Sequence, residues 1–238
     1  MRLKLATFAL LPALVIQGYK VKKNIIRLPE PKGEREGLIG SGKALSILIV
    51  GDSAAAGVGV NHQNDALTGS ILNELNPDFE ITWQLEATTG HTTDQVIQTI
   101  KTLKRRHFDV VLSSVGVNDV TKLNSANQWI KKQHTLYSLI EEKFSPQMII
   151  ATGVPPMDMF PALPNPLGWL FGQYAQAMNQ KLAILVDQHP KMDWIEYDIQ
   201  QYRDLKLDMA ADGFHPSKDV YQLWAKQVAD KVRLYFQD

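Results

Sequence analysis

The sequence predicts one α/β domain in which a parallel sheet of five strands is covered by helices on both faces. Its 238 residues are 45% apolar and 21% charged, which suits a single well-buried domain. From residue 44 onward, short β-rich runs alternate with longer runs of helical period, the order typical of parallel sheets. Three of the short runs are almost continuously apolar, as expected of strands that are buried on both faces.

Five short runs are the expected strands, and the first, third and fourth are the apolar ones. They lie at residues 45–50, 81–85, 110–115, 148–152 and around 194. The second run is less apolar, which favours an edge strand. Apolar residues three or four positions apart predict helices around Val96, Trp129 and Val220. A further helix is expected over residues 167–186, after a stretch that contains five prolines.

The N-terminal segment differs in composition from the rest of the chain. Arg2 and Lys4 precede a mostly apolar run over residues 5–16, which is the layout of a signal peptide or a short membrane anchor. Three interpretations stay open: an uncleaved membrane-associated leader, a cleaved signal peptide, and an ordinary helix. The first two predict a location in the cell envelope, reached by membrane association or by export.

Composition therefore divides the chain into three parts. Residues 1–19 are the hydrophobic leader or anchor, and residues 20–43, with their prolines and glycines, read as a linker. Residues 44–238 are the expected domain.

Charge and cysteine content exclude several classes of function. Lys plus Arg and Asp plus Glu both number 25, so no basic field favours nucleic acid as a partner. The chain has no cysteine, which excludes disulfides, thiolate nucleophiles and Cys-ligated zinc. Its six histidines have no ligand spacing with one another, so no metal site is expected.

The sequence contains near matches to three common ligand-binding or catalytic motifs, but none of the three is complete. Residues 37–44 resemble a phosphate-binding loop, but Ala44 stands where Ser or Thr is required, and the loop precedes a strand. Gly57 and Gly59 lack the third glycine of a dinucleotide-binding fingerprint. The Gly-x-Ser-x-Gly elbow is absent around Ser53.

Chemistry-bearing residues follow the expected strands, where the ligand site of an open parallel sheet lies. Ser53 comes just after the first strand, beside Gly51 and a run of alanines. A serine hydroxyl needs a base to act as a nucleophile, and His215 is the candidate. The Asp-x-x-His spacing can let Asp212 accept from Nδ1 and leave Nε2 facing Ser53. Asp208 is a competing partner for the histidine.

Stabilisation of an oxyanion requires hydrogen-bond donors near the nucleophile. Asn118 follows the third strand and offers a side-chain amide, although it could instead cap the next helix, as Asp119 could. The backbone amides of Ser53 and Gly90 would complete the set, since Gly90 lacks a side chain and permits close approach. His91, next in the chain, is a candidate for lining the pocket.

Four sequence blocks together resemble the SGNH hydrolase (GDSL-type esterase/lipase) family. The resemblance spans residues 45–235, and its blocks are Gly51-Asp52-Ser53, Gly90, Gly116-Val117-Asn118-Asp119 and Asp212-x-x-His215-Pro216. It implies a flavodoxin-like three-layer α/β/α sandwich with five parallel strands. It also implies Ser53, Asp212 and His215 as catalytic residues, with Ser53, Gly90 and Asn118 as oxyanion donors. Ala54 departs from the family pattern, which has leucine there, and this weakens the analogy of substrate more than that of mechanism.

The resemblance implies a serine esterase that hydrolyses carboxylic esters through an acyl-enzyme intermediate and needs no cofactor. The substrate expected is a short-acyl or lipid-like ester, of esterase, lipase or lysophospholipase type. Residues 155–171 are rich in apolar side chains, which could form an acyl pocket, meet lipid, or simply pack on the sheet. Two alternatives remain: a carbohydrate O-acetyl esterase, and a non-catalytic binding module with this fold. Membrane association through the leader is the other interaction expected.

Overall fold

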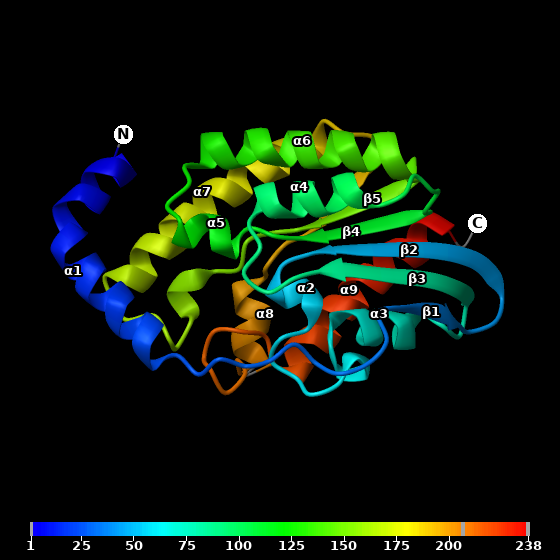
Figure 1. Cartoon of the computed structure of the whole chain (residues 1–238), viewed down its shortest axis with the longest axis horizontal. Coiled ribbons are helices and arrows are strands. Elements are labelled where there is room, and N and C mark those ends of the chain that lie inside the picture. Colours follow the sequence, from blue (N-terminus) through cyan, green and yellow to red (C-terminus); the bar gives the residue numbers. More distant parts are fainter. Residues whose placement is uncertain (1, 206–207, 237–238) are drawn as a thin grey trace.

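A central sheet with helices on both faces makes up the computed structural model, which describes residues 2–205 and 208–236 (Figure 1). The sheet has six strands in the order β1-β3-β2-β4-β5-β6. They are β1 (Glu36–Ile39), β2 (Lys43–Gly51), β3 (Phe79–Ala87), β4 (Val110–Ser114), β5 (Met148–Thr152) and β6 (Met192–Ile195). Strands β2 to β6 pair in parallel, and β1 pairs antiparallel with β3. The predicted α/β sandwich is confirmed, with one strand more than the five expected.

The additional strand, β1, lies inside the range that the sequence predicts as a linker. All four of its residues are exposed, so it lacks the buried positions by which the other strands were recognised. It pairs along the outer side of β3, with Gly37 opposite Trp83. The prediction that β3 is an edge strand is therefore wrong, because β1 takes the edge position.

Helices cover the sheet on both faces and connect its strands. They are α1 (Arg2–Asn24), α2 (Ser53–Ala56), α3 (Leu67–Leu75), α4 (Thr93–Thr102), α5 (Val117–Thr121), α6 (Ala126–Phe144), α7 (Leu167–Asp187), α8 (Ile199–Asp204) and α9 (Lys218–Phe236). Two short 3₁₀ helices, η1 (Gln63–Asp65) and η2 (Met157–Met159), lie in connecting segments. The helix predicted over residues 167–186 is confirmed within one residue at each end.

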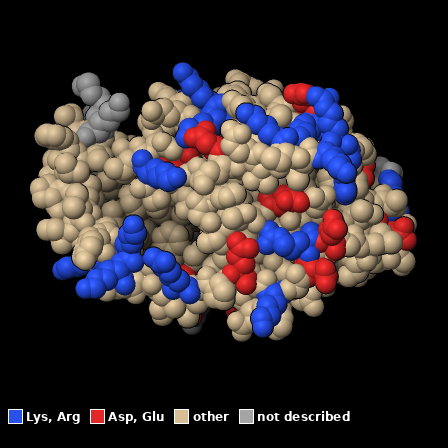
Figure 2. Space-filling model, viewed as in Figure 1, with Lys and Arg blue, Asp and Glu red and all other residues tan. Residues whose placement is uncertain are grey.

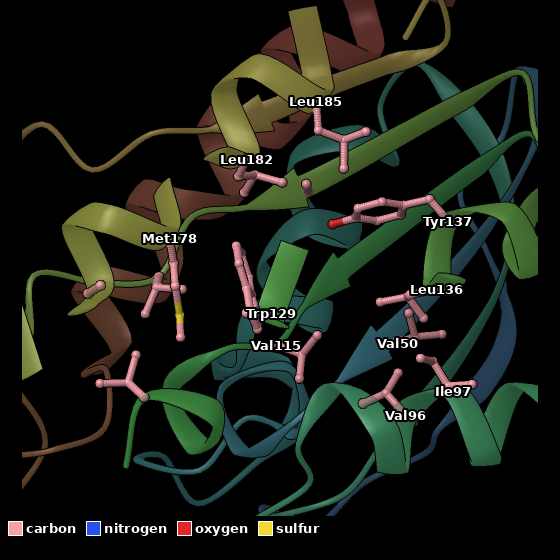
Figure 3. Close-up of a cluster of buried hydrophobic side chains, with 14 of the residues drawn as sticks. Val50, Val96, Ile97, Val115, Trp129, Leu136, Tyr137, Met178, Leu182 and Leu185 are labelled. Atoms are coloured by element: carbon pink, nitrogen blue, oxygen red, sulfur yellow. The ribbon is translucent and has the colours of Figure 1, made fainter. Parts of the chain in front are cut away.

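Each face of the sheet has its own apolar core. Because side chains alternate along a strand, β2 sends Leu48 and Val50 to one face and Ile47 and Ile49 to the other. The first core lies under α4, α6 and α7 and includes the fully buried Trp129 (Figure 3). The second lies under α3 and α9. Burial on both sides fixes the strands, and hence the segments that leave their carboxyl ends.

Helix α1 lies outside this sandwich, along α7, at the left of Figure 1. Leu14 is buried against α7, and the Thr7 hydroxyl lies 3.2 Å from the Tyr174 hydroxyl. The Gln17 side chain donates to the Asn165 carbonyl and accepts from the Leu167 amide. Among the residues that the structure describes, no helix is both long and apolar enough to cross a membrane.

Candidate active site

Ser53 is the first residue of α2, directly beyond the carboxyl end of β2. The strand ends at Gly51, where a Cβ would lie 2.1 Å from the Ser114 carbonyl oxygen, so only glycine allows this close approach to β4. The Asp52 side chain then caps α2 by accepting from the Ala54 amide at 3.1 Å. Ser53 is 9% exposed, and its hydroxyl reaches the edge of a cavity.

A continuous hydrogen-bonded path connects Asp212, His215 and Ser53. The Ser53 Oγ lies 2.9 Å from His215 Nε2. On the other side of the ring, His215 Nδ1 lies 2.5 Å from Asp212 Oδ2. The structure therefore brings together the three residues that the sequence predicts as nucleophile, base and orienting carboxylate.

The carboxylate of Asp212 is buried and held by several donors. Its Oδ1 accepts from the Phe214 and His215 amides, each at 2.9 Å. Burial acts to raise its pKa, but the hydrogen bonds from the His215 ring and from these amides outweigh burial and keep the pKa below its ordinary value. Asp212 is thus ionised near neutral pH, and it favours the tautomer of His215 that leaves Nε2 free to accept a proton.

Contacts with the rest of the loop hold the histidine in place. The His215 carbonyl accepts from the Ala210 amide at 2.8 Å, and the Gly213 carbonyl accepts from the Ala162 amide at 3.1 Å. The Phe214 ring packs edge-on against both His215 and Phe160. Asp208, the competing partner considered from the sequence, is exposed, and among the described contacts it is Asp212 that bonds the histidine.

Asn118 and Gly90 lie on two segments that the structure joins. The Asn118 side-chain amide donates to the carbonyl of His91 at 3.0 Å, directly beside Gly90. Gly90 has a φ of 84°, and a Cβ there would meet nothing within 4 Å, so its surroundings are open. Neither Asn118 nor Gly90 is among the residues that line the cavity beside Ser53, and His91 contributes its carbonyl without lining the cavity.

The helix-capping alternative for Asn118 and Asp119 is resolved differently for each residue. Gly116 is the N-cap of α5, so Asn118 lies inside the first turn, and its side chain does not cap α5. Asp119 is fully buried and accepts from both the amide and the hydroxyl of Thr93, each at 2.8 Å. Asp119 therefore ties the start of α4 to α5, and so holds the segment of Asn118 beside that of Gly90.

Asp52 is a residue whose role the sequence analysis missed. Besides capping α2, its carboxylate accepts a hydrogen bond from the Gly116 amide, and its own amide donates to the Ser114 carbonyl at 3.0 Å. It thus links the turn of Ser53 to the segment of Asn118. Burial raises its pKa to about 6, although the bonds from Ala54 and Gly116 act in the opposite direction. The sequence feature that could have indicated this role is an acidic residue between a strand and a helix.

A cavity of about 340 Å³ opens beside Ser53 and His215. Its walls are mainly apolar, and they come from the ends of β4 and β5, the loop before α7, the segments around α8 and His215, and α9. Large apolar side chains that line it include Val154, Met159, Phe160, Tyr197, Tyr202, Met209, Phe214, Val220 and Trp224. Of residues 155–171, Met159, Phe160 and three prolines line the cavity, whereas Met157, Leu163 and Leu170 are buried in the core. The segment therefore contributes side chains both to the cavity wall and to the core.

The described residues place no three His, Asp or Glu side chains close enough together to hold a metal ion. The polar groups of the site are instead arranged for proton transfer between Ser53 and His215, next to an apolar cavity.

Comparisons with known proteins find one matching family and several similar solved structures. The model of the GDSL-like lipase/acylhydrolase family matches residues 49–223. Similar solved structures include a lipolytic protein of the G-D-S-L family from Veillonella parvula, with 16% identity, a TM-score of 0.63, and coverage of 78% of this chain and 96% of that one. The lipase Lip_vut3 from a goat rumen metagenome has 17% identity, a TM-score of 0.58, and coverage of 78% and 96%.

The acetylxylan esterase Axe2 from Geobacillus stearothermophilus has 16% identity, a TM-score of 0.58, and coverage of 82% of this chain and 95% of that one. At these identities the likeness is one of fold. No curated protein sequence matches the chain well enough to count as a relative.

Proposed function

The chain belongs to the GDSL-like lipase/acylhydrolase family and is an ester-hydrolysing enzyme, and we propose that it acts as a serine esterase through an acyl-enzyme intermediate. Ser53 is the nucleophile, His215 the general base and Asp212 the residue that orients the histidine. The observation that carries this proposal is the hydrogen-bonded path from Asp212 through His215 to Ser53, which ends at a cavity.

The first half of the reaction acylates the serine. His215 Nε2 removes the proton from Ser53 Oγ as this oxygen attacks the carbonyl carbon of the ester. The resulting imidazolium is stabilised by Asp212, which lies 2.5 Å from Nδ1. His215 then gives the proton to the departing alcohol, and the acyl group stays on Ser53.

Water completes the cycle. His215 removes a proton from the water molecule, which attacks the acyl carbon, and the proton is then passed to Ser53 Oγ as the carboxylic acid leaves. No redox step and no external group are required, because every proton that His215 takes is returned within the same half-reaction.

The oxyanion that forms in each half needs donors close to Ser53. The Ser53 amide is in the first turn of α2, where a helix leaves its N–H groups without helical partners. We assign the Gly90 amide and the Asn118 side-chain amide as the other two donors. The bond from Asn118 to the His91 carbonyl supports this assignment, since it uses one amide hydrogen and leaves the second for the substrate.

The apolar cavity supports an acyl group as the part of the substrate that it binds. Met159, Phe160 and Phe214 offer hydrocarbon and aromatic surface beside the nucleophile, which suits a short-acyl or lipid-like ester.

A carbohydrate O-acetyl ester is the second candidate, and a neighbouring recess favours it. This recess shares Val154, Pro156 and Tyr197 with the cavity, and its other walls carry amides, two carboxylates and an indole. Those side chains are Asp158, Gln173, Gln176, Asn179, Gln180, Trp194 and Glu196. Such groups suit a leaving group with several hydroxyls, and Axe2 is described as an acetylxylan esterase.

Hydrolysis of p-nitrophenyl esters from acetyl to palmitoyl, together with acetylated xylo-oligosaccharides, tests the proposal. We expect the full chain to hydrolyse at least one of these substrates and Ser53→Ala to lose that activity. A preference for longer acyl chains would support the lipid-like ester, and turnover of the acetylated sugar alone would support the second candidate. Equal rates for the full chain and Ser53→Ala would contradict the serine mechanism.

A further inference from the structure

Over residues 5–16, helix α1 is mostly apolar around its whole circumference, yet only one side of it is packed. Leu10, Leu14 and Val21 face the core beside α7. On the opposite side Phe8 is 78% exposed, and four other large side chains are more than half exposed. Those four are Leu5, Val15, Ile16 and Tyr19. A helix that is apolar on all sides is stable only when both sides are covered, so the outward side of α1 lacks its partner.

Charge is distributed unevenly around this helix. All 25 acidic residues of the chain come after position 29, whereas six of its 25 basic residues come before it. Four of these basic residues are Lys20, Lys22, Lys23 and Arg27, which are exposed at the end of α1 and form no ion pair with any described residue. Figure 2 shows basic side chains gathered along the lower left edge of the molecule, next to a surface without acidic groups.

This surface lies on the same side of the molecule as the candidate active site. The carboxyl ends of the strands point toward the side where α1 lies (Figure 1). A groove between the last turn of α1 and the following loops is lined by Asn24, Ile25, Pro164 and Asp212, so the helix end adjoins the carboxylate that holds His215. Exposed apolar side chains continue this surface at the start of α7, where Trp169 is 43% exposed.

We propose that the outward face of α1, defined as Leu5, Phe8, Val15, Ile16 and Tyr19, docks on an anionic lipid surface, with the basic cluster Lys20, Lys22, Lys23 and Arg27 contacting the lipid head groups. Two complementary features favour a lipid surface as the occupant. An interfacial helix inserts apolar side chains among the acyl chains, and basic side chains at its end attract anionic head groups. A polar partner protein would leave the outward apolar face of α1 uncovered by apolar groups.

Docking in this way would turn the entrance of the cavity toward the lipid. Met159 lines the cavity and is 36% exposed. It belongs to η2, which packs against α7 as α1 does. The inference goes beyond the proposed function, because binding to lipid requires none of the chemistry of Ser53.

Co-sedimentation with vesicles tests the proposal on the full chain carrying Ser53→Ala, which keeps the lipids intact. One set of vesicles is phosphatidylcholine alone, and the other is phosphatidylcholine mixed with phosphatidylglycerol. We expect stronger binding to the mixed vesicles. On these, Phe8→Asp should weaken binding roughly tenfold or more through lost apolar insertion, and Lys22→Glu with Lys23→Glu about twentyfold or more.

Matched control variants carry the same kinds of substitution at exposed positions outside α1. Leu234→Asp alters a side chain that is 85% exposed on α9, and Lys101→Glu with Lys104→Glu reverses two exposed charges near the end of α4. We expect these variants to bind vesicles as the parent does. In the background with Ser53 intact, all four should hydrolyse a soluble short-chain ester at the parental rate, which checks folding and keeps this test separate from the proposed function.

Two outcomes would overturn the proposal. One is equal sedimentation of the α1 variants and the control variants with the mixed vesicles. The other is a parent that does not bind vesicles but forms dimers that Phe8→Asp dissociates, as measured by sedimentation velocity, because the outward face would then be covered by a second copy of the chain.

Discussion

Two clusters of a serine, a histidine and an aspartate lie at opposite ends of the sheet and differ in the order of their contacts. The Ser53 cluster at the carboxyl ends of the strands is Ser53, Asp212 and His215, and the Ser46 cluster at the amino ends is Ser46, His107 and Asp109. In the Ser53 cluster the imidazole lies between the carboxylate and the hydroxyl. In the Ser46 cluster the carboxylate lies in the middle, so His107 contacts Asp109 and the Ser46 hydroxyl donates to the same carboxylate.

The surroundings of the Ser46 cluster explain its structural role. Asp109 accepts from Ser46 Oγ at 2.6 Å, from the Ser46 amide at 2.8 Å and from the Gln147 side chain at 2.7 Å. These bonds join the starts of β2, β4 and β5. The His107 side chain is 54% exposed and faces solvent. Residue types alone therefore do not distinguish the two clusters: only in the Ser53 cluster does the imidazole contact the hydroxyl, which lies beside a cavity.

Removing each serine in turn should give the largest difference between the two clusters. Ser53→Ala should lower kcat by about 10⁴-fold or more, because the proposed nucleophile is lost. Ser46→Ala should leave kcat within about twofold and lower the free energy of unfolding by about 1–2 kcal/mol, through loss of the bonds to Asp109. Steady-state hydrolysis and urea unfolding of both variants measure this, and similar losses of activity in the two would contradict it.

Substitution of the aspartate in each cluster, Asp212 or Asp109, should give the next largest difference in activity. Asp212→Asn should lower kcat by about 10³- to 10⁴-fold, since an amide favours the wrong tautomer of His215 and no longer stabilises the imidazolium. Asp109→Asn should affect stability and leave kcat unchanged. The measurement is kcat with the ester that the wild type hydrolyses best. Full activity in Asp212→Asn would show that the histidine needs no orienting carboxylate.

A smaller effect is expected for the proposed oxyanion donor. Asn118→Ala should lower kcat by about 10²- to 10³-fold, the usual effect of losing one such donor, with little change in stability. The matched control is Asn124→Ala, because the Asn124 amide bonds the carboxylate of Asp119 nearby. An Asn118→Ala variant as active as Asn124→Ala would remove Asn118 from the oxyanion site.

The smallest difference is expected between two carboxyl groups with opposite pKa shifts, the buried Asp52 and the half-buried Asp109. Burial raises the pKa of Asp52 to about 6, so the folded state holds its proton more tightly than the unfolded chain, and its contribution to stability falls as pH rises from about 4 to 6. Asp52→Asn should therefore gain stability relative to the wild type over this window, by up to about 3 kcal/mol.

Asp109 should behave in the opposite way. Burial acts to raise its pKa, but hydrogen bonds from Ser46, His107 and Gln147 outweigh it and lower the pKa. Its stabilisation is present above the unfolded pKa of about 4 and is lost as pH falls through the folded value. Urea unfolding between pH 3 and pH 8 compares both variants with the wild type. Parallel pH profiles for Asp52→Asn and Asp109→Asn would contradict the assigned shifts.

Sequence patterns predicted most of the fold because most strands are buried. The runs at 110–115 and 148–152 agree with β4 and β5 to within a residue, since a continuous apolar run between turn residues has few other structures available. β1 was missed because all of its residues are exposed, and pairing with β3 is a property of the tertiary structure.

The candidate site was predictable to the extent that its residues lie in short recognisable blocks. The sequence singled out Ser53, Asp212 and His215, and the structure brings them into contact. The bond from Asp52 to the Gly116 amide could not be predicted in the same way, because it depends on burial and on a partner 64 residues away in the chain. The cavity likewise combines residues from segments far apart in the sequence.

Covalent labelling tests the central claim most directly. The full chain is treated with diisopropyl fluorophosphate, which reacts with activated serines, and the adduct is located by peptide mass spectrometry. We expect one adduct per chain, on Ser53, with loss of hydrolysis in proportion to labelling, and no adduct in Ser53→Ala or on Ser46. Loss of activity with the label on another residue, or full labelling of Ser53 with activity retained, would contradict it.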